Sequence, residues 1–186
     1  ITTTIPLMGK HQRTNCAAAA MALLLIARHE KRLTRTAIEQ GLHHVKWPGR
    51  FQVLKAGKTD VVIDGAHNPA GIDTFCKTYT DVFGDRKRVF LFSVLADKDY
   101  TQMVKELFHA DDYVVCAPAP TPRTSDPKKM AAMLPCRANA AESIAQGLDR
   151  AFAAVQDNQV LCIVGSLYIQ GEVRNYLRDT YHVTNL

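Results

Sequence analysis

The chain of 186 residues has no long apolar segment and few cysteines, and each shortage excludes a class of protein. No apolar run approaches the roughly 20 residues that span a bilayer. Residues 17–26 are the longest candidate, and they are too short, rich in alanine and unlike a signal peptide. The five cysteines are odd in number and never spaced as Cys-x-x-Cys, which argues against disulfides and structural zinc. We expect a cytoplasmic protein with no metal site of its own in this segment.

Two signatures of nucleotide binding are also missing. The pair Gly9-Lys10 is not a G-x-x-x-x-G-K-[ST] phosphate loop, because no glycine lies five residues earlier and His11 stands where Ser or Thr is required. No G-x-G-x-x-G follows a predicted strand, which disfavours a dinucleotide oxidoreductase. The net charge of +5 comes from short basic groups without interleaved aromatics, so we expect no nucleic-acid partner. An anionic small molecule fits the same charge.

The remaining sequence alternates between strand and helix patterns. Strands are predicted at residues 1–8 (with a proline kink), 51–54, 61–63, 89–94, 113–117, 136–138 and 160–164. Helices are predicted at residues 15–30, from Thr34 or Thr36 to about 44, and at 72–83, 100–108, 128–134, 141–155 and 167–178. Such alternation is typical of an α/β, Rossmann-like fold with a mostly parallel sheet and helices on both faces.

A break in this pattern at residues 47–50 (Trp-Pro-Gly-Arg) marks a predicted domain boundary. The two helices before it have too little partner surface of their own. We therefore interpret residues 1–46 as the end of a domain whose beginning is absent, with which the lack of an initiating Met agrees, and residues 47–186 as a second domain.

The stretch at residues 61–69 (Val-Val-Ile-Asp-Gly-Ala-His-Asn-Pro) organises the second domain. Its apolar start predicts a buried strand, while Asn68 can cap a helix whose first position Pro69 occupies. Asp64 and His67 then lie on a strand-to-helix loop at the carboxyl end of a parallel strand, where open α/β sheets bind ligands. An ordinary turn, in which Asp64 only bonds nearby backbone, explains the same residues.

Each of the four strongest predicted strands ends in polar loop residues. If these strands are parallel, their loops line one edge of the sheet, with His67, Lys98, Arg123 and Ser166 beside Asp64. Such a rim suits an anionic ligand, and Ser166 can present backbone N–H groups at a helix N-terminus. Arg123 has only its loop position in its favour.

Five motifs together resemble the Mur ligase superfamily, and in particular the carboxyl-terminal part of its folate branch, the dihydrofolate synthase/folylpolyglutamate synthases. They come in the family's order over essentially the whole chain. The motifs are residues 9–15 (Gly-Lys-His-Gln-Arg-Thr-Asn), 47–50 (Trp-Pro-Gly-Arg), 64–69 (Asp-Gly-Ala-His-Asn-Pro), 95–99 (Leu-Ala-Asp-Lys-Asp) and 165–168 (Gly-Ser-Leu-Tyr).

The resemblance implies an ATP-dependent amide ligase that phosphorylates a carboxylate and lets the amine of L-glutamate attack the acyl phosphate. Its substrates would be ATP, L-glutamate and dihydropteroate or folate. Residues 1–46 would be the end of a P-loop-type central ATPase domain. The phosphate loop and the Mg²⁺ ligands of the family lie upstream of this chain, so we expect a monomeric fragment that is inactive alone.

The resemblance also implies roles for individual residues. Asn15 matches the residue that contacts adenine, Arg50 the arginine that reaches the phosphates, Asp64 the acid that accepts from the ribose hydroxyls, and His67 the histidine beside the phosphates. Amide and guanidinium groups suit these tasks.

Lys98 and Ser166 occupy positions that hold the carboxylates of the incoming amino acid in related ligases. Asn15 and Ser166 could also simply cap their helices.

Two other functions remain open. A free-standing module that binds a nucleotide or an acidic metabolite should bind ADP or glutamate unaided. A Mur ligase of peptidoglycan synthesis should accept a nucleotide-linked peptide, whereas full dependence on a pteroate or folate acceptor would exclude it.

Overall fold

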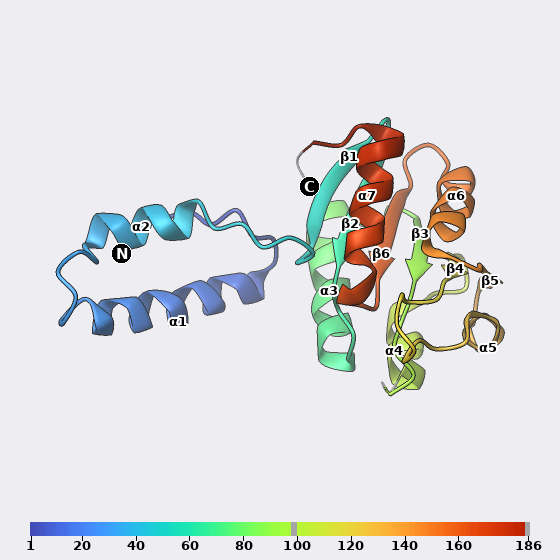
Figure 1. Cartoon of the computed structure of the whole chain (residues 1–186), viewed down its shortest axis with the longest axis horizontal. Coiled ribbons are helices and arrows are strands. Elements are labelled where there is room, and N and C mark those ends of the chain that lie inside the picture. The colour runs from blue at the N-terminus through green and yellow to red at the C-terminus, as the bar shows by residue number, and fades with distance from the viewer. Residues whose placement is uncertain (98–99, 185–186) are drawn as a thin grey trace.

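The computed structural model describes residues 1–97 and 100–184. Two helices, α1 (Lys10–Ile26) and α2 (Arg35–His43), extend to one side of an α/β unit that holds the rest of the chain (Figure 1). The buried core that the two helices share is small and consists of Ala20, Ile38 and Leu42. The assignment of residues 1–46 to a larger ATPase domain stays a prediction.

Residues 1–8 form no regular element in the described chain, so the predicted strand was wrong. They run beside α2 and are held by its side chains and backbone. The Thr2 amide donates to Glu39 Oε1 over 3.0 Å, and the Thr3 hydroxyl donates to the Glu39 carbonyl over 3.1 Å. Residues with a high preference for β-structure form a strand only where another strand is available for pairing, and the neighbour of residues 1–8 is the helix α2.

Both helices begin where a cap or turn residue allows. The first starts five residues before the predicted position, directly after Gly9, whose φ of 102° requires glycine. The second is capped by Thr34, whose hydroxyl accepts from the Ala37 amide over 3.1 Å. Thr34 was therefore the correct choice of the two predicted start residues.

The α/β unit is built on a six-stranded sheet of order β1-β2-β6-β3-β4-β5. All neighbouring strands are parallel except β1 and β2, which pair antiparallel. The predicted fold class is confirmed. The strands are β1 (Gln52–Ala56), β2 (Thr59–Asp64), β3 (Arg88–Phe92), β4 (Tyr113–Cys116), β5 (Arg137–Ala140) and β6 (Val160–Val164).

Helices cover both faces of the sheet and form two hydrophobic cores. One core includes Ile72, Phe75 and Met103 from the first group of helices, and the other includes Leu148 and Val173 from the second. The first group is α3 (Pro69–Phe83), α4 (Tyr100–Leu107) and α5 (Pro127–Ala132); the second is α6 (Ile144–Ala154) and α7 (Gln170–Tyr181), preceded by the short helix η1 (Leu167–Ile169).

Two cysteines lie in these central strands, as predicted, and behave as small apolar side chains. Cys116 and Cys162 are fully buried. Burial raises the pKa of the Cys116 thiol to about 12 and that of Cys162 further, so both thiols stay neutral at physiological pH.

The strand register places the ligand-facing loops together. Asp64 at the end of β2 lies beside Val164 at the end of β6, and Phe92 at the end of β3 lies beside Val164 and Cys116. The predicted common edge of the four parallel strands is therefore confirmed. Because β1 is antiparallel, its first residue, Gln52, lies opposite Ile63, and the linker from α2 enters at this same edge.

Candidate functional site

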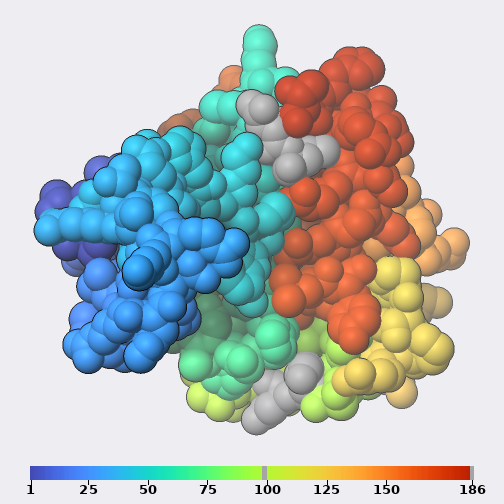
Figure 2. Space-filling model, turned by 60° about the vertical axis from the view of Figure 1, so that its left-hand side comes forward, coloured from blue at the N-terminus to red at the C-terminus, as the bar shows by residue number. Residues whose placement is uncertain are grey.

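A cavity of about 450 Å³ lies where the two-helix unit meets the α/β unit. In Figure 2 the blue helices adjoin the cyan and green surface of the linker and α3. The cavity brings together Asn15, Arg50 and Asp64, three of the four residues predicted to bind a nucleotide. Other side chains that line it come from α1, from the linker and from α3, and include His11, Gln12, Trp47, Phe51, Thr74 and Phe75.

Asp64 forms the inner wall of this cavity and also ties backbone segments together. Its Oδ2 accepts from the Phe51 amide and its Oδ1 from the Ala66 amide, each over 2.7 Å. Burial raises the pKa of Asp64 above its ordinary value, although these two bonds and the nearby Arg50 act in the opposite direction. Asp64 therefore makes the backbone contacts expected of an ordinary turn, and it also lines the cavity.

The linker beside Asp64 has an unusual backbone. Gly49 has a φ of 74° and Phe51 a φ of 42°, and positive φ is a genuine outlier for an aromatic residue. The Phe51 ring is buried against Phe75, with a centroid distance of 5.5 Å. The Gly65 amide donates to the Gly49 carbonyl over 2.9 Å. Arg50 therefore lies between two residues whose backbone is tethered.

Trp47, which belongs to the predicted domain boundary and was given no site role, also lines the cavity. Its side chain is 61% exposed at the cavity and lies 6.0 Å, centroid to guanidinium carbon, from Arg50. This exposure beside an arginine is visible only in the structure, and the signal in the sequence was that Trp47 shares a motif with Arg50.

Asn15 lies inside α1, so it does not cap the helix. Its Nδ2 donates to Gln12 Oε1 over 3.1 Å, and Gln12 is 7% exposed. Gln12 and His11 share the cavity with Asn15, and both were missed. Because the predicted helix began at Asn15, their spacing of three and four residues from Asn15 on one helix became visible only with the structure.

His67 lies on the predicted loop but outside the set of residues that line the cavity. It is half-buried, and its Nδ1 lies 2.8 Å from the Gly65 carbonyl. Because a carbonyl only accepts, Nδ1 carries the proton and Nε2 of the neutral ring is an acceptor. The next residues begin α3 as predicted: Asn68 Oδ1 accepts from the Gly71 amide over 2.8 Å, with Pro69 at the first helical position.

The other side of the sheet edge carries Ser166, which is 4% exposed. Its hydroxyl accepts from the Tyr168 amide over 3.1 Å and caps η1, which confirms the predicted capping contact. Lys98 lies outside the described residues. Arg123 forms an ion pair with Asp97 and links the loop after β3 to the loop after β4.

No group of three or more His, Cys, Asp or Glu side chains comes together as a metal site within residues 1–97 and 100–184. Asp64 is the one carboxylate among the described residues that line the cavity, and backbone amides already occupy both of its oxygens. These donors do not by themselves fit a Mg²⁺ site.

The helices in the described part of the chain are also too short or too polar to cross a membrane.

Residues 49–167 match the family model of the Mur ligase, glutamate ligase domain. The chain belongs to this family. A probable bifunctional folylpolyglutamate synthase/dihydropteroate synthase of Halobacterium salinarum is 32% identical over 191 residues, which cover all of this chain and 22% of that protein. The chain thus spans less than a quarter of that relative's length.

Solved structures of the family have the same fold. A Mycobacterium tuberculosis folylpolyglutamate synthase complexed with ADP matches with a TM-score of 0.79 and 30% identity, over 93% of this chain and 41% of that chain. A Yersinia pestis folylpolyglutamate synthase/dihydrofolate synthase complexed with AMPPNP and Mn ion matches with a TM-score of 0.69 and 26% identity, over 78% of this chain and 35% of that chain. All three relatives are folate enzymes, which favours the folate branch over the peptidoglycan branch.

Proposed function

We propose that this Mur ligase domain is the glutamate-side part of an ATP-dependent carboxylate–amine ligase that adds L-glutamate to dihydropteroate or folate. The observation that carries the proposal is the cavity at the carboxyl edge of the sheet, where Asn15, Arg50 and Asp64 converge. Membership of the glutamate ligase family and the similarity to a folylpolyglutamate synthase complexed with ADP support it.

The cavity has the chemistry that an adenine nucleotide needs. Trp47, Phe51 and Phe75 supply aromatic surface, while a small number of polar groups can fix orientation, as in most small-molecule sites. In this proposal the Asn15 amide meets the base, and the Arg50 guanidinium meets the phosphates in a forked contact.

His67 would lie beside the phosphates, with Nε2 as the ring nitrogen that the Gly65 carbonyl does not contact. Lys98 and Ser166 would hold the carboxylates of glutamate. Clamping several anionic groups in line stabilises the charge that develops during phosphoryl and acyl transfer.

The phosphate loop and the metal ligands would come from a preceding ATPase domain, of which residues 1–46 would be the last part. Mg²⁺ usually binds through one or two carboxylates together with substrate phosphates, and the described cavity residues do not provide a complete set. The whole ligase would act as a monomer, with the nucleotide between the two domains.

The first experiment tests the cavity by calorimetric titration of the purified chain with ADP; a free-standing module would also bind ADP, so the second experiment separates the two functions. We expect one binding site, weakened about tenfold or more in Arg50→Ala because a charge-assisted phosphate contact is lost. Arg137→Ala is the matched control, since Arg137 lies on the edge strand β5, outside the described cavity lining. Equal binding by wild type and Arg50→Ala would contradict the assignment of the cavity.

The second experiment tests the reaction. A hybrid in which this chain replaces the matching segment of the M. tuberculosis enzyme should add glutamate to a pteroate or folate acceptor. In that hybrid Lys98→Ala should raise the KM for glutamate with little change in the KM for ATP. A hybrid that used only a nucleotide-linked peptide acceptor would favour the peptidoglycan branch, and ligation by the isolated chain would refute its expected inactivity.

A further inference from the structure

The contacts of Asp64 lead through the backbone to Arg50. The Phe51 amide donates to Asp64 Oδ2 over 2.7 Å, and Phe51 holds a φ of 42° with its ring 2% exposed. A non-glycine residue persists in this region only when its surroundings hold it there. The carboxylate of Asp64 is one part of those surroundings.

The residue on the other side of Arg50 is tethered as well. The Gly49 carbonyl accepts from the Gly65 amide over 2.9 Å, and the Gly49 amide donates to Gln52 Oε1 over 3.1 Å. Arg174 Nη2 donates to the same Gln52 oxygen over 2.9 Å. The backbone of Arg50 is thus fixed on one side by Asp64 and on the other by the residue that follows Asp64.

We propose that Asp64 is a positioning residue for Arg50: its carboxylate holds the strained Phe51 amide and thereby directs the Arg50 guanidinium into the cavity. The proposal rests on the proposed nucleotide function and assigns Asp64 this role in place of the predicted ribose contact, since both of its oxygens already accept from backbone amides. Without the carboxylate, the Phe51 amide loses its acceptor and the linker can relax to negative φ. Arg50 then samples more conformations, and every phosphate-bearing ligand is bound less tightly.

Asp64→Asn is the variant that separates this role from a ribose contact. The asparagine side chain has one oxygen, which can replace only one of the two carboxylate oxygens that accept from the Phe51 and Ala66 amides. Its NH₂ group is a donor and faces the remaining amide, so one of the two hydrogen bonds is lost. The substitution also removes a buried charge, and the fold is retained more readily than with alanine. If Asp64→Asn does not fold, Asp64→Glu displaces the carboxylate by one methylene and serves in its place.

Two ligands distinguish the two roles: ADP, and 2′,3′-dideoxy-ADP, which lacks both ribose hydroxyls. Positioning predicts that Asp64→Asn weakens the binding of both by the same factor, on the order of tenfold, and that the factor falls to about twofold or less in an Arg50→Ala background. A ribose contact predicts that only ADP is affected and that the loss persists without Arg50. The second pattern would overturn the proposal.

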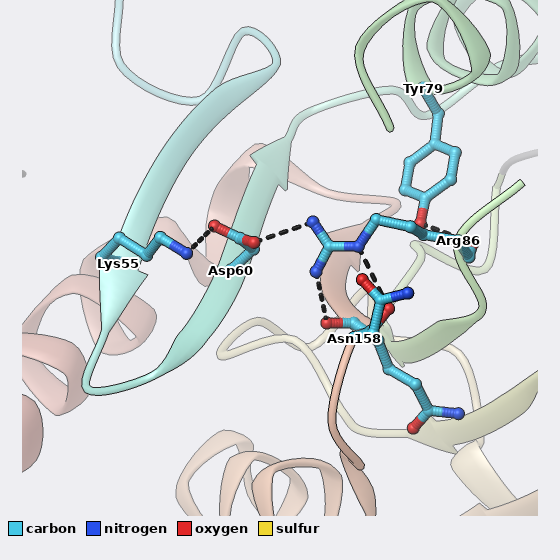
Figure 3. Close-up of polar contacts among 6 residues, drawn as sticks. Lys55, Asp60, Tyr79, Arg86 and Asn158 are labelled. Carbon is cyan, nitrogen blue, oxygen red and sulfur yellow. Dashed lines mark hydrogen bonds and ion pairs between the residues drawn. The ribbon is translucent and has the colours of Figure 1, made fainter. Parts of the chain in front are cut away.

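Asp60 provides a matched control on the same strand. It accepts from Lys55 Nζ over 2.7 Å and from Arg86 Nη1 over 2.8 Å, at the end of β2 that is remote from the cavity (Figure 3). Asp60→Asn breaks contacts of a carboxylate on β2 without touching the linker. It should leave both ligand affinities within about twofold of wild type.

The fluorescence of Trp47 gives a readout that needs no ligand. Trp47 is the only tryptophan of the chain and lies 6.0 Å from the Arg50 guanidinium. Asp64→Asn should shift its emission in the free protein, whereas Asp60→Asn should not. If wild type binds neither nucleotide, the proposed function fails while this comparison still tests the positioning role. Emission and affinities of Asp64→Asn equal to those of wild type would refute the positioning role.

Discussion

Arg88 and Asp112 form a two-bond ion pair that is almost completely buried. Arg88 Nε donates to Asp112 Oδ1 over 3.0 Å and Nη2 donates to Oδ2 over 2.6 Å, with side-chain exposures of 8% and 3%. The pair joins the start of β3 to the residue before β4, and Asp112 also accepts from the His109 amide over 2.7 Å. It lies at the edge of the sheet opposite the cavity, so its contribution is to folding.

Arg88→Met should destabilise the fold by about 3–5 kcal/mol, because it leaves the Asp112 carboxylate buried without its cation. Arg88→Met combined with Asp112→Asn should recover most of this loss, since the amide is neutral and still accepts from His109. Urea unfolding of the three variants measures the effect. A double variant less stable than Arg88→Met alone would show that the charge of Asp112 is not the cause.

The two carboxylates of β2 should respond to pH with opposite signs. Burial raises the pKa of Asp64, so the folded state holds this proton more tightly than the unfolded state. The contribution of Asp64 to the free energy of unfolding therefore falls as pH rises from 3.8 through the raised pKa. Burial acts in the same direction on Asp60, but the contacts with Lys55 and Arg86 outweigh it and lower the pKa. Its contribution is present above pH 3.8 and is lost as pH falls through the lowered pKa.

Unfolding of wild type, Asp64→Asn and Asp60→Asn by urea between pH 3 and roughly pH 7 tests this. The stability of wild type relative to Asp64→Asn should decrease with rising pH, and its stability relative to Asp60→Asn should increase. Two differences of the same sign would contradict the assigned environments.

Gly165, after β6, should tolerate no side chain. Its φ is 114°, and a Cβ there would lie 2.3 Å from the Ser93 carbonyl oxygen. Gly165→Ala should cost about 3 kcal/mol or more, because both the backbone conformation and the packing oppose it. Gly171→Ala, in α7 with open space around it, should instead stabilise by about 0.5–1 kcal/mol. Thermal unfolding of both variants distinguishes a local clash from a general effect of Gly→Ala.

Trp47 should contribute contact area to the bound nucleotide. Trp47→Ala should raise the Kd for ADP by roughly two- to tenfold, which is the range expected for loss of one aromatic contact, and Trp47→Phe should recover part of it. Trp47 also lies beside a second hollow lined by Pro6 and Val53. If Trp47→Ala binds ADP as well as wild type does, its side chain serves that second hollow instead.

The fold was largely predictable because its signals are local. Continuous apolar runs marked the central strands, and Asn68 with Pro69 marked the start of α3. Residues 1–8 were misjudged because their alternation fits a strand, while the available neighbour is Glu39 of a helix. Local pattern does not reveal the pairing partner.

The cavity was predicted in part, for a related reason. Asp64 and Arg50 lie at or beside the end of a predicted strand, whereas His11 and Gln12, although they belong to a motif, become cavity residues because α1 lies near α3. The positive φ of Phe51 was beyond sequence reasoning, since an aromatic residue has no intrinsic preference for that conformation. Its tertiary contacts impose it.

The antiparallel pairing of β1 has a mechanical consequence. Because β1 begins at the edge of the sheet where the cavity lies, the connection between α2 and the sheet is also a wall of that cavity. The linker that joins the two helices to the sheet is therefore built in part from the residues that would hold the nucleotide. A ligand that contacts both Asn15 and Asp64 would connect the two-helix unit directly to the sheet, in addition to the covalent linker.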